Sequence, residues 1–319
     1  MKRILFLISV SLVIIGILIS GIALASCGFS FNTMSNVNSI QKSYNTTEDF
    51  SDIHVDDACG FFDIKIEISD IEKPEISYVG PDNITLTYET KDGKLTVKTD
   101  DTRGFFGQNL GFVGATQLTL RLPDKSYGNV KIENASGNIS ISGITAKNLD
   151  VLVASGTVNI SDSSLAAVSV DTASGDVYIR DSSASSILTD TASGDVTMRS
   201  LTVSGSVSVD IGSGDVEVDS CELGSFSGEG GSGDYEFENT LVSSDLKVDV
   251  GSGDIEFSRS DAKELWINTA SGDIEGTLLT GKQFDADSSS GRVRVPSSAS
   301  EGGKCYLRTG SGDIEIRVG

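Results

Sequence analysis

The stretch Asp171–Val177, DTASGDV, occurs again at Asp190–Val196, and a close variant, NTASGDI, occupies Asn268–Ile274. The glycine that follows the serine recurs at intervals of 19, 19, 19, 20, 19, 20, 19, 19 and 21 residues. These glycines are Gly137, Gly156, Gly175, Gly194, Gly214, Gly233, Gly253, Gly272, Gly291 and Gly312. A period this short and steady does not fit a helical-hairpin repeat, and it predicts one turn of a β-solenoid per repeat.

The residues on both sides of each Ser-Gly pair alternate between apolar and polar. Around Ser174, for example, Val168 and Val170 precede the pair, and Val177 and Ile179 follow it. This alternation is typical of strands with one buried side, so each coil is predicted to hold one strand before the pair and one after it. Stacked coils then bury a column of apolar residues that no single coil could bury. The predicted fold is all-β: a single-chain β-solenoid (β-helix) of about ten 19–20-residue coils.

The Ser-Gly pair is predicted to form the corner between the two strands of a coil. Glycine adopts backbone conformations that a residue with a Cβ atom resists. The aspartate that often follows suits a turn, because its side chain bonds nearby backbone N–H groups. A looser apolar position farther along each repeat, which includes Leu241 and Leu279, is expected to close the coil.

The N-terminal residues predict attachment to a membrane. Ile4–Ala25 is an uncharged, mostly apolar run of 22 residues, long enough to span a bilayer as a helix. Lys2 and Arg3 precede it, which places the rest of the chain on the outer side. The run ends in LASC at Leu24–Cys27, the pattern of a bacterial lipobox, so Cys27 is a lipidation candidate. Both interpretations predict a cell-membrane protein, single-pass or lipid-anchored, with an extracytoplasmic body.

Four segments follow from these patterns. Residues 1–27 are the transmembrane helix or lipoprotein signal, 28–45 an Asn- and Ser-rich tether, 46–128 an irregular β segment, and 129–319 the SGD-repeat solenoid. The β segment is expected to cap the solenoid, because an open end exposes strand edges. Within it, a degenerate coil begins at Ile53, a hairpin turns at Asp92-Gly93, and the strand 116–123 leads into the regular coils.

A membrane-anchoring segment, a variable β segment and many SGD[VI]-x-[VI] repeats together resemble the bacterial putative-adhesin family of β-strand-repeat proteins, a domain of unknown function. The resemblance covers roughly residues 45–319. It implies a β-solenoid at the cell envelope, and it brings no catalytic residues.

Charge and residue usage exclude several classes of function. The formal net charge of −22 argues against nucleic acid, which needs Lys and Arg opposite its phosphates. The single histidine, His54, is expected on the outward side of a strand, and no phosphate-binding loop is present. The four cysteines have no CxxC spacing and predict neither a zinc site nor a disulfide framework. No catalytic, cofactor or metal site is therefore predicted, and the protein is interpreted as not an enzyme.

The repeats also stack acidic residues into columns, which leaves two interpretations of the corner aspartates open. Ca²⁺ binds carboxylate and carbonyl oxygens, so a calcium-binding repeat protein is one alternative. The other is that each carboxylate caps backbone N–H groups in its turn. Residues 292–319 differ, because they hold five bases against three acids. As the expected last coil, they either neutralise their acidic neighbour or form an exposed end that docks a partner or another copy.

The function predicted from the sequence is a non-enzymatic cell-envelope protein that displays a rigid acidic β-solenoid as an adhesin-like or scaffold module. Expected partners are the cytoplasmic membrane, through the N-terminal helix or lipid, and an unknown envelope protein or polysaccharide. The alternatives are a structural protein that polymerises through its solenoid ends and a calcium-binding repeat protein. The interaction-surface candidates are Tyr178, Trp266, Tyr306, Arg292, Arg294, Arg308 and Arg317.

Overall fold

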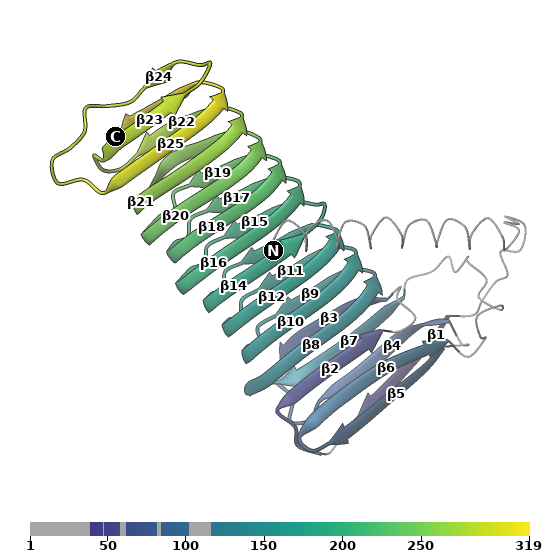
Figure 1. Ribbon diagram of the computed structural model, residues 1–319. Helices are drawn as coiled ribbons and strands as arrows, with labels where there is room; N and C mark the ends of the chain where they lie inside the picture. Colours follow the sequence, from purple (N-terminus) through teal and green to yellow (C-terminus); the bar gives the residue numbers. More distant parts are fainter. Residues whose placement is uncertain (1–38, 47, 58–61, 82–83, 102–115) are drawn as a thin grey trace, which may run out of the picture. The chain divides into compact units, whose positions relative to one another are not determined.

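The computed structural model describes residues 39–46, 48–57, 62–81, 84–101 and 116–319 (Figure 1). Within these ranges the regular elements are all β-strands. None of the described residues belongs to a helix long and apolar enough to cross a membrane. The predicted membrane segment Ile4–Ala25 and the lipidation candidate Cys27 lie outside the described ranges.

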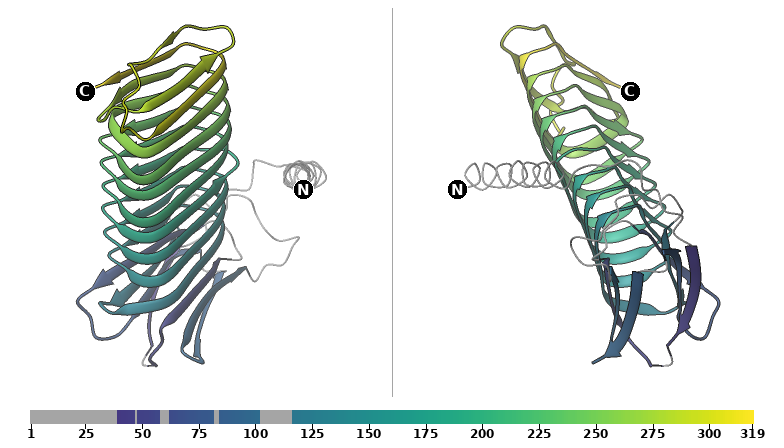
Figure 2. Two further views of the ribbon diagram at one scale, coloured as in Figure 1. Left: turned by 60° about the vertical axis from the view of Figure 1, so that its left-hand side comes forward. Right: turned by 90° about the vertical axis from the view of Figure 1, so that its right-hand side faces the viewer.

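Each regular coil contributes one strand to each of two parallel sheets, which face each other along the stack (Figures 1 and 2). The long-strand sheet contains β8 (Ser126–Ser136), β10 (Thr145–Ser155), β12 (Ser164–Ser174), β14 (Ser183–Thr191), β16 (Thr202–Ser213), β18 (Glu222–Ser232), β20 (Leu241–Ser252) and the second part of β21 (Ile255–Ser271). The short-strand sheet contains β9 (Ile139–Ser142), β11 (Val158–Ser161), β13 (Val177–Arg180), β15 (Val196–Arg199), β17 (Val216–Asp219), β19 (Tyr235–Glu238), the first part of β21, and β22 (Ile274–Leu278). The predicted β-solenoid of about ten coils is confirmed.

The core lies between the two sheets and consists of the inward residues that the alternation predicts. Val168 and Val170 in β12, and Val177 and Ile179 in β13, are all buried. Large inward side chains on one strand of a coil face small ones on the other. For example, the bulky ring of Tyr235 in β19 faces glycines in β18 of the same coil. An ideal Cβ atom on Gly228 would lie 2.4 Å from Cε1 of Tyr235. Each coil therefore fills its own cross-section.

The Ser-Gly corner is present and requires glycine for two reasons. Gly194 has a φ of +132°, a conformation that side chains with a Cβ atom rarely adopt. An ideal Cβ atom on Gly194 would also lie 2.3 Å from the carbonyl oxygen of Gly175, one coil earlier. The glycines can thus stack backbone against backbone, and the predicted corner is confirmed.

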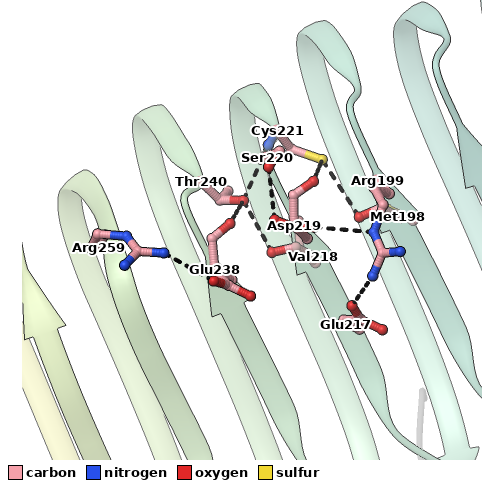
Figure 3. A network of polar contacts seen from close by, with 10 residues as sticks. All are labelled: Met198, Arg199, Glu217, Val218, Asp219, Ser220, Cys221, Glu238, Thr240 and Arg259. Atoms are coloured by element: carbon pink, nitrogen blue, oxygen red, sulfur yellow. Dashed lines mark hydrogen bonds and ion pairs between the residues drawn. The ribbon is translucent and has the colours of Figure 1, made fainter.

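A second corner follows each short strand, and the sequence did not indicate its polar construction (Figure 3). In six coils, one residue takes a left-handed conformation there, with φ between 48° and 57°: Asp162, Asp181, Ser200, Ser220, Asn239 and Arg259. The next side chain in several coils satisfies backbone groups of the corner. The Thr240 hydroxyl lies 3.0 Å from the Val218 carbonyl oxygen and 2.9 Å from that of Glu238, and accepts the Cys221 N–H at 3.3 Å. The buried corner is therefore closed by hydroxyl hydrogen bonds.

Two residues expected to close the coil do not do so. Leu241 and Leu279 are 47% and 42% exposed, because they lie on the outer side of the chain where it turns into the long-strand sheet. Leu201 and Cys221, at the corner itself, are buried and close their coils.

The N-terminal strands extend both sheets beyond the regular coils. β2 (Asp52–Asp57) and β3 (Asp63–Ser69) form the predicted degenerate coil and pair with β8 and β9. Outside them lie β6 (Lys94–Asp101) beside β2 and β7 (Gln117–Pro123) beside β3. Antiparallel strands complete this end: β5 (Ile84–Lys91), β4 (Glu75–Pro81) and β1 (Ser39–Asn45). The predicted hairpin is confirmed as β5–β6. The strand expected to lead into the regular coils exists as β7, which directly precedes β8 in the sequence. In the sheet, however, β7 pairs with β3, on the side of β3 that faces away from the regular coils.

The C-terminal coils do not stack in sequence order. β25 (Lys304–Ser311) lies between β21 and β23 (Gln283–Ser288), and β26 (Ile314–Val318) lies between β22 and β24 (Val293–Arg294). The expectation that the final residues form the last coil of the stack is therefore wrong. Leu307 of β25 is 1% exposed, whereas Val293 of β24 is 41% exposed. The more apolar coil takes the inner position, where both of its sides are covered by neighbouring strands, and the shorter, less apolar coil takes the edge.

Candidate interaction surface

Two of the candidate aromatic residues meet on the outer side of the long-strand sheet. Trp266 in β21 and Tyr306 in β25 are direct neighbours in the register, and their ring centroids are 4.0 Å apart with an interplanar angle of 22°. Trp266 is 38% exposed, as its outward position predicts. The two residues are 40 positions apart in the sequence, and only the insertion of β25 beside β21 brings them together. We refer to them as the aromatic pair.

Charged and polar side chains surround the aromatic pair. The register continues the same outward column with Lys247 on one side and Asp285 on the other. Arg308, two residues after Tyr306 on β25, donates to the Asp285 carboxylate at 2.8 Å and to its carbonyl oxygen at 2.6 Å. The Asn268 amide donates to the Asp249 carboxylate at 2.7 Å. The polar groups around the rings are thus already held in place by neighbouring coils.

A series of acidic residues lies in the outward column of this sheet that includes Arg308. The column contains Asp171, Asp190, Asp210, Glu229 and Asp249, one per coil. Partial burial raises the pKa of Asp190, and the carboxylates of Asp210 and Asp171 raise it further. This side of the solenoid is therefore a line of mutually repelling carboxylates that ends near the aromatic pair.

The third aromatic candidate lies on the other sheet. Tyr178 belongs to β13 of the short-strand sheet, and its hydroxyl is 3.4 Å from the Asp176 carboxylate. Desolvation by partial burial and nearby carboxylates raise its pKa. Its outward column continues into a second acidic series: Glu217, Glu236, Glu256, Glu275 and Glu315. Tyr178 therefore does not extend the aromatic pair.

The four candidate arginines are divided between two sheets and a corner. Arg294 and Arg317 both contact Glu315, at 3.5 Å and 2.5 Å, on the short-strand sheet. Arg308 pairs with Asp285 on the long-strand sheet. The backbone N–H of Arg292, at the Ser-Gly corner, donates to the Asp313 carboxylate at 2.8 Å. These residues do not form one basic end surface, so the arrangement does not favour head-to-tail docking through them.

The corner aspartates accept hydrogen bonds from backbone N–H groups. Each carboxylate accepts the N–H of the equivalent residue in the next coil of the stack: that of Asp215 donates to Asp195 at 2.9 Å, and that of Asp254 donates to Asp234 at 2.8 Å. Within the described ranges, no group of three or more His, Cys, Asp or Glu side chains is placed to hold a metal ion. The structure thus shows the capping interpretation of these residues and offers no ligand set for the calcium alternative in those ranges.

His54 lies on the outward side of β2, as the alternation predicts. Its Nε2 atom is 2.6 Å from Oε2 of Glu133 in the neighbouring strand β8, a partner that the sequence did not indicate. The structure therefore places this histidine in a hydrogen bond with Glu133 on the sheet surface.

A groove of about 690 Å³ runs along the solenoid where the long strands begin. It crosses β16, β18, β20 and β21, and its outer wall includes the exposed side chains of Leu241 and Leu279. At the C-terminal end of the groove, Lys282 and Asp261 contact each other at 2.6 Å. The sequence did not single out either residue.

The stacked parallel coils, with strands beyond them at the N-terminal end, define a repeat protein of the parallel β-solenoid class. The chain belongs to the family described as Toastrack DUF4097, whose model matches residues 50–219 and 204–319.

Several solved structures resemble the chain. A putative adhesin from Parabacteroides distasonis ATCC 8503 is 15% identical, with 88% of this chain and 98% of that chain covered and a TM-score of 0.49. A putative adhesin from Bacteroides fragilis NCTC 9343 is 15% identical, with 89% and 98% covered and a TM-score of 0.45. A structure described as a putative lipid binding protein from Parabacteroides distasonis ATCC 8503 is 15% identical, with 88% and 97% covered and a TM-score of 0.36. No curated protein matches the chain.

Proposed function

We propose that this chain is a non-enzymatic, adhesin-like interaction module of the bacterial cell envelope. Its N-terminal segment attaches it to the cytoplasmic membrane, either as a single helix or through a lipid on Cys27, and the acidic solenoid is displayed outside. Three features support the proposal: the apolar run Ile4–Ala25 behind two basic residues, the absence of any catalytic motif in the sequence, and the extended outward surfaces of the two sheets.

The aromatic pair is the observation that carries the proposal. Trp, Tyr and Arg are the residues that most often dominate the binding energy of protein interfaces. Here Trp266 and Tyr306 stack on an outward surface that is mostly acidic and polar, with Arg308 held beside them. An envelope protein or polysaccharide that lies across the stacked strands would cover the rings and meet hydrogen-bonding groups on both sides of them.

Binding to envelope material tests this surface. The full chain would be compared with Trp266→Ala and Tyr306→Ala for binding to purified bacterial cell-wall sacculi and to immobilised envelope protein. We expect each variant to weaken binding about tenfold or more, which corresponds to about 1.4 kcal/mol. Leu188→Ala is the matched control, because Leu188 lies in the same outward column, several coils away, and is 49% exposed. Equal binding by all four proteins would contradict the proposal.

Membrane attachment is tested separately. In cells, the full chain should fractionate with membranes and be cleaved by protease added to spheroplasts, whereas a chain that lacks residues 1–27 should remain soluble in the cytoplasm. Cys27→Ser separates the two modes of attachment, because it should release only a lipid-anchored protein. Protection of the full chain from external protease would contradict an extracytoplasmic body.

A further inference from the structure

Lys282 and Asp261 bring an amine and a carboxylate together inside the protein. The Nζ atom of Lys282 is 2.6 Å from Oδ1 of Asp261, and the two side chains are only 4% and 9% exposed. Burying two charges has a desolvation cost that their attraction offsets only when the geometry is very good.

Thr280 connects the two groups through its hydroxyl. Its Oγ1 atom donates to Oδ2 of Asp261 at 2.6 Å and accepts a hydrogen bond from Nζ of Lys282 at 2.9 Å. A continuous path for a proton therefore runs from the amine, through the hydroxyl, to the second carboxyl oxygen. The backbone of Ala262 completes the arrangement, because its N–H donates to Oδ1 of Asp261 at 2.8 Å and its carbonyl oxygen accepts from Nζ at 2.6 Å.

We propose that Lys282 and Asp261 condense into an isopeptide bond, with Thr280 as the proton relay. One proton first passes from the ammonium of Lys282 to Oδ2 of Asp261, which leaves a neutral amine and a neutral acid. Nζ then attacks Cγ of Asp261 and forms the N–C bond, and negative charge develops on Oδ1. A second proton passes from the nitrogen through the Thr280 hydroxyl to Oδ2. The Cγ–Oδ2 bond breaks, Oδ2 leaves as water, and an amide remains, so the reaction needs no other reactant.

Each neighbour has a defined role in this reaction. A desolvated lysine amine is a competent nucleophile. The Ala262 N–H, already bonded to Oδ1, stabilises the charge that appears on that atom in the tetrahedral intermediate. The fold holds the reacting groups in contact, which removes the entropic cost of their encounter. Asp261, Thr280 and Lys282 all line the end of the groove, so the departing water has a path to solvent.

The bond would lock the part of the solenoid where the coils are out of sequence order. Asp261 lies in β21, and Lys282 directly precedes β23, the strand at the edge of the long-strand sheet. β25 lies between these two strands and pairs with both, although it directly follows neither of them in the sequence. An amide between Asp261 and Lys282 would therefore clamp the edge coil over the inserted one.

Mass spectrometry of the folded full chain tests the proposal. We expect the wild-type protein to lack the mass of one water molecule and a tryptic digest to contain a branched peptide that joins Asp261 to Lys282, uncut after Lys282. Lys282→Arg is the matched control, since it keeps the charge and the donors but cannot form this amide, and it should keep its full mass. Thr280→Val should fold, as circular dichroism can verify, and slow the condensation about a hundredfold.

Three results would overturn the proposal. The first is a folded wild-type chain in which trypsin cleaves fully after Lys282 and no branched peptide exists. The second is a Lys282→Arg variant that loses the same water. The third is an unbranched peptide that lacks water at Asp261, which would indicate a succinimide formed with the following backbone nitrogen.

Discussion

The Oδ1 atom of Asp254 accepts the backbone N–H of Asp273, one coil farther along the chain, at 2.7 Å. The flanking N–H groups of Gly272 and Ile274 point the other way and donate to carbonyl oxygens of the adjacent coil on their other side, those of Ser311 and Asp313. The corner therefore contains one amide that faces the earlier coil, and a carboxylate there accepts it. This is the physical reason for the third letter of the SGD repeat.

Replacing one corner aspartate should therefore change stability mainly through loss of the hydrogen bond, and less through loss of the negative charge. Asp254→Ala is expected to lower the free energy of unfolding by about 1 kcal/mol, because the Asp273 N–H loses its acceptor. Asp254→Asn should be close to neutral, since Asn138 already performs this role for Thr157 at 3.0 Å. Urea denaturation of the three proteins measures the difference, and equal losses for Ala and Asn would contradict the explanation.

The outer glutamate column should give an unusual dependence of stability on pH. Partial burial and the neighbouring carboxylates of Glu256 and Glu217 raise the pKa of Glu236. The folded state therefore holds this proton more tightly than the unfolded state, and the destabilisation by the ionised form disappears as pH falls through the folded pKa. Glu236→Gln should be more stable than wild type near neutral pH, and the difference should shrink in acid.

Glu133→Gln is the control for that experiment, because its effect on stability near neutral pH should have the opposite sign. Hydrogen bonds from Lys131 and His54 lower the pKa of Glu133. Its contribution to stability is present above the unfolded pKa and is lost as pH falls through the folded one. Glu133→Gln should thus be less stable than wild type near neutral pH and converge in acid. Urea midpoints measured across a pH series would refute this account if both variants shifted in the same direction.

Three buried hydroxyls near the middle of the solenoid predict stabilising substitutions. Among the described residues, the Oγ1 atoms of Thr172, Thr189 and Thr191 are buried and have no hydrogen-bond partner. Thr191→Val removes such a hydroxyl while it keeps the shape, so it should raise the free energy of unfolding by about 1 kcal/mol. Thr269→Val is the matched control in the same column. The Thr269 hydroxyl donates to the Gly253 carbonyl oxygen at 3.2 Å, so its loss should destabilise.

The complementary sizes in the coil of Tyr235 can be tested by a double-mutant cycle. Gly228→Ala would place a methyl group 2.4 Å from Cε1 of Tyr235, and overpacking of this kind costs about 1–3 kcal/mol. In a Tyr235→Val background, the coil resembles its neighbours and has room for the methyl group. The destabilisation by Gly228→Ala should then largely vanish, and an unchanged value in both backgrounds would show that the two residues do not determine each other's size.

Local patterns in the sequence predicted most of the coil. The alternation of side chains reports which residues face inward, so Val177, Ile179 and their equivalents could be placed in the core without a structure. The Ser-Gly corner could be predicted too, because glycine has few other reasons to recur at a fixed spacing. The acceptor role of the corner aspartates was one of two open interpretations, and only the stacked coils show that each partner lies one coil away.

The pairing partners of the terminal strands could not be predicted, since all repeats carry nearly the same motif. The alternation of apolar and polar residues allows either β23 or β25 to pair with β21. In the structure β25 takes this position, and its Leu307 is buried whereas Val293 of the edge coil is exposed. The aromatic pair was missed as a pair for the same reason. The contact of Lys282 with Asp261 was missed because it depends on the irregular chain between β22 and β23.

The inserted position of β25 and β26 has a consequence for how the protein is made. During synthesis β23 and β24 leave the ribosome first, yet their final neighbours are strands that have not been translated. A chain that stops before Lys304 lacks β25 and β26, the strands with which β23 and β24 pair. Correct assembly of this end therefore requires that translation has proceeded through β26, and a product truncated before Lys304 would expose an incomplete sheet edge to the proteases and chaperones that survey new chains.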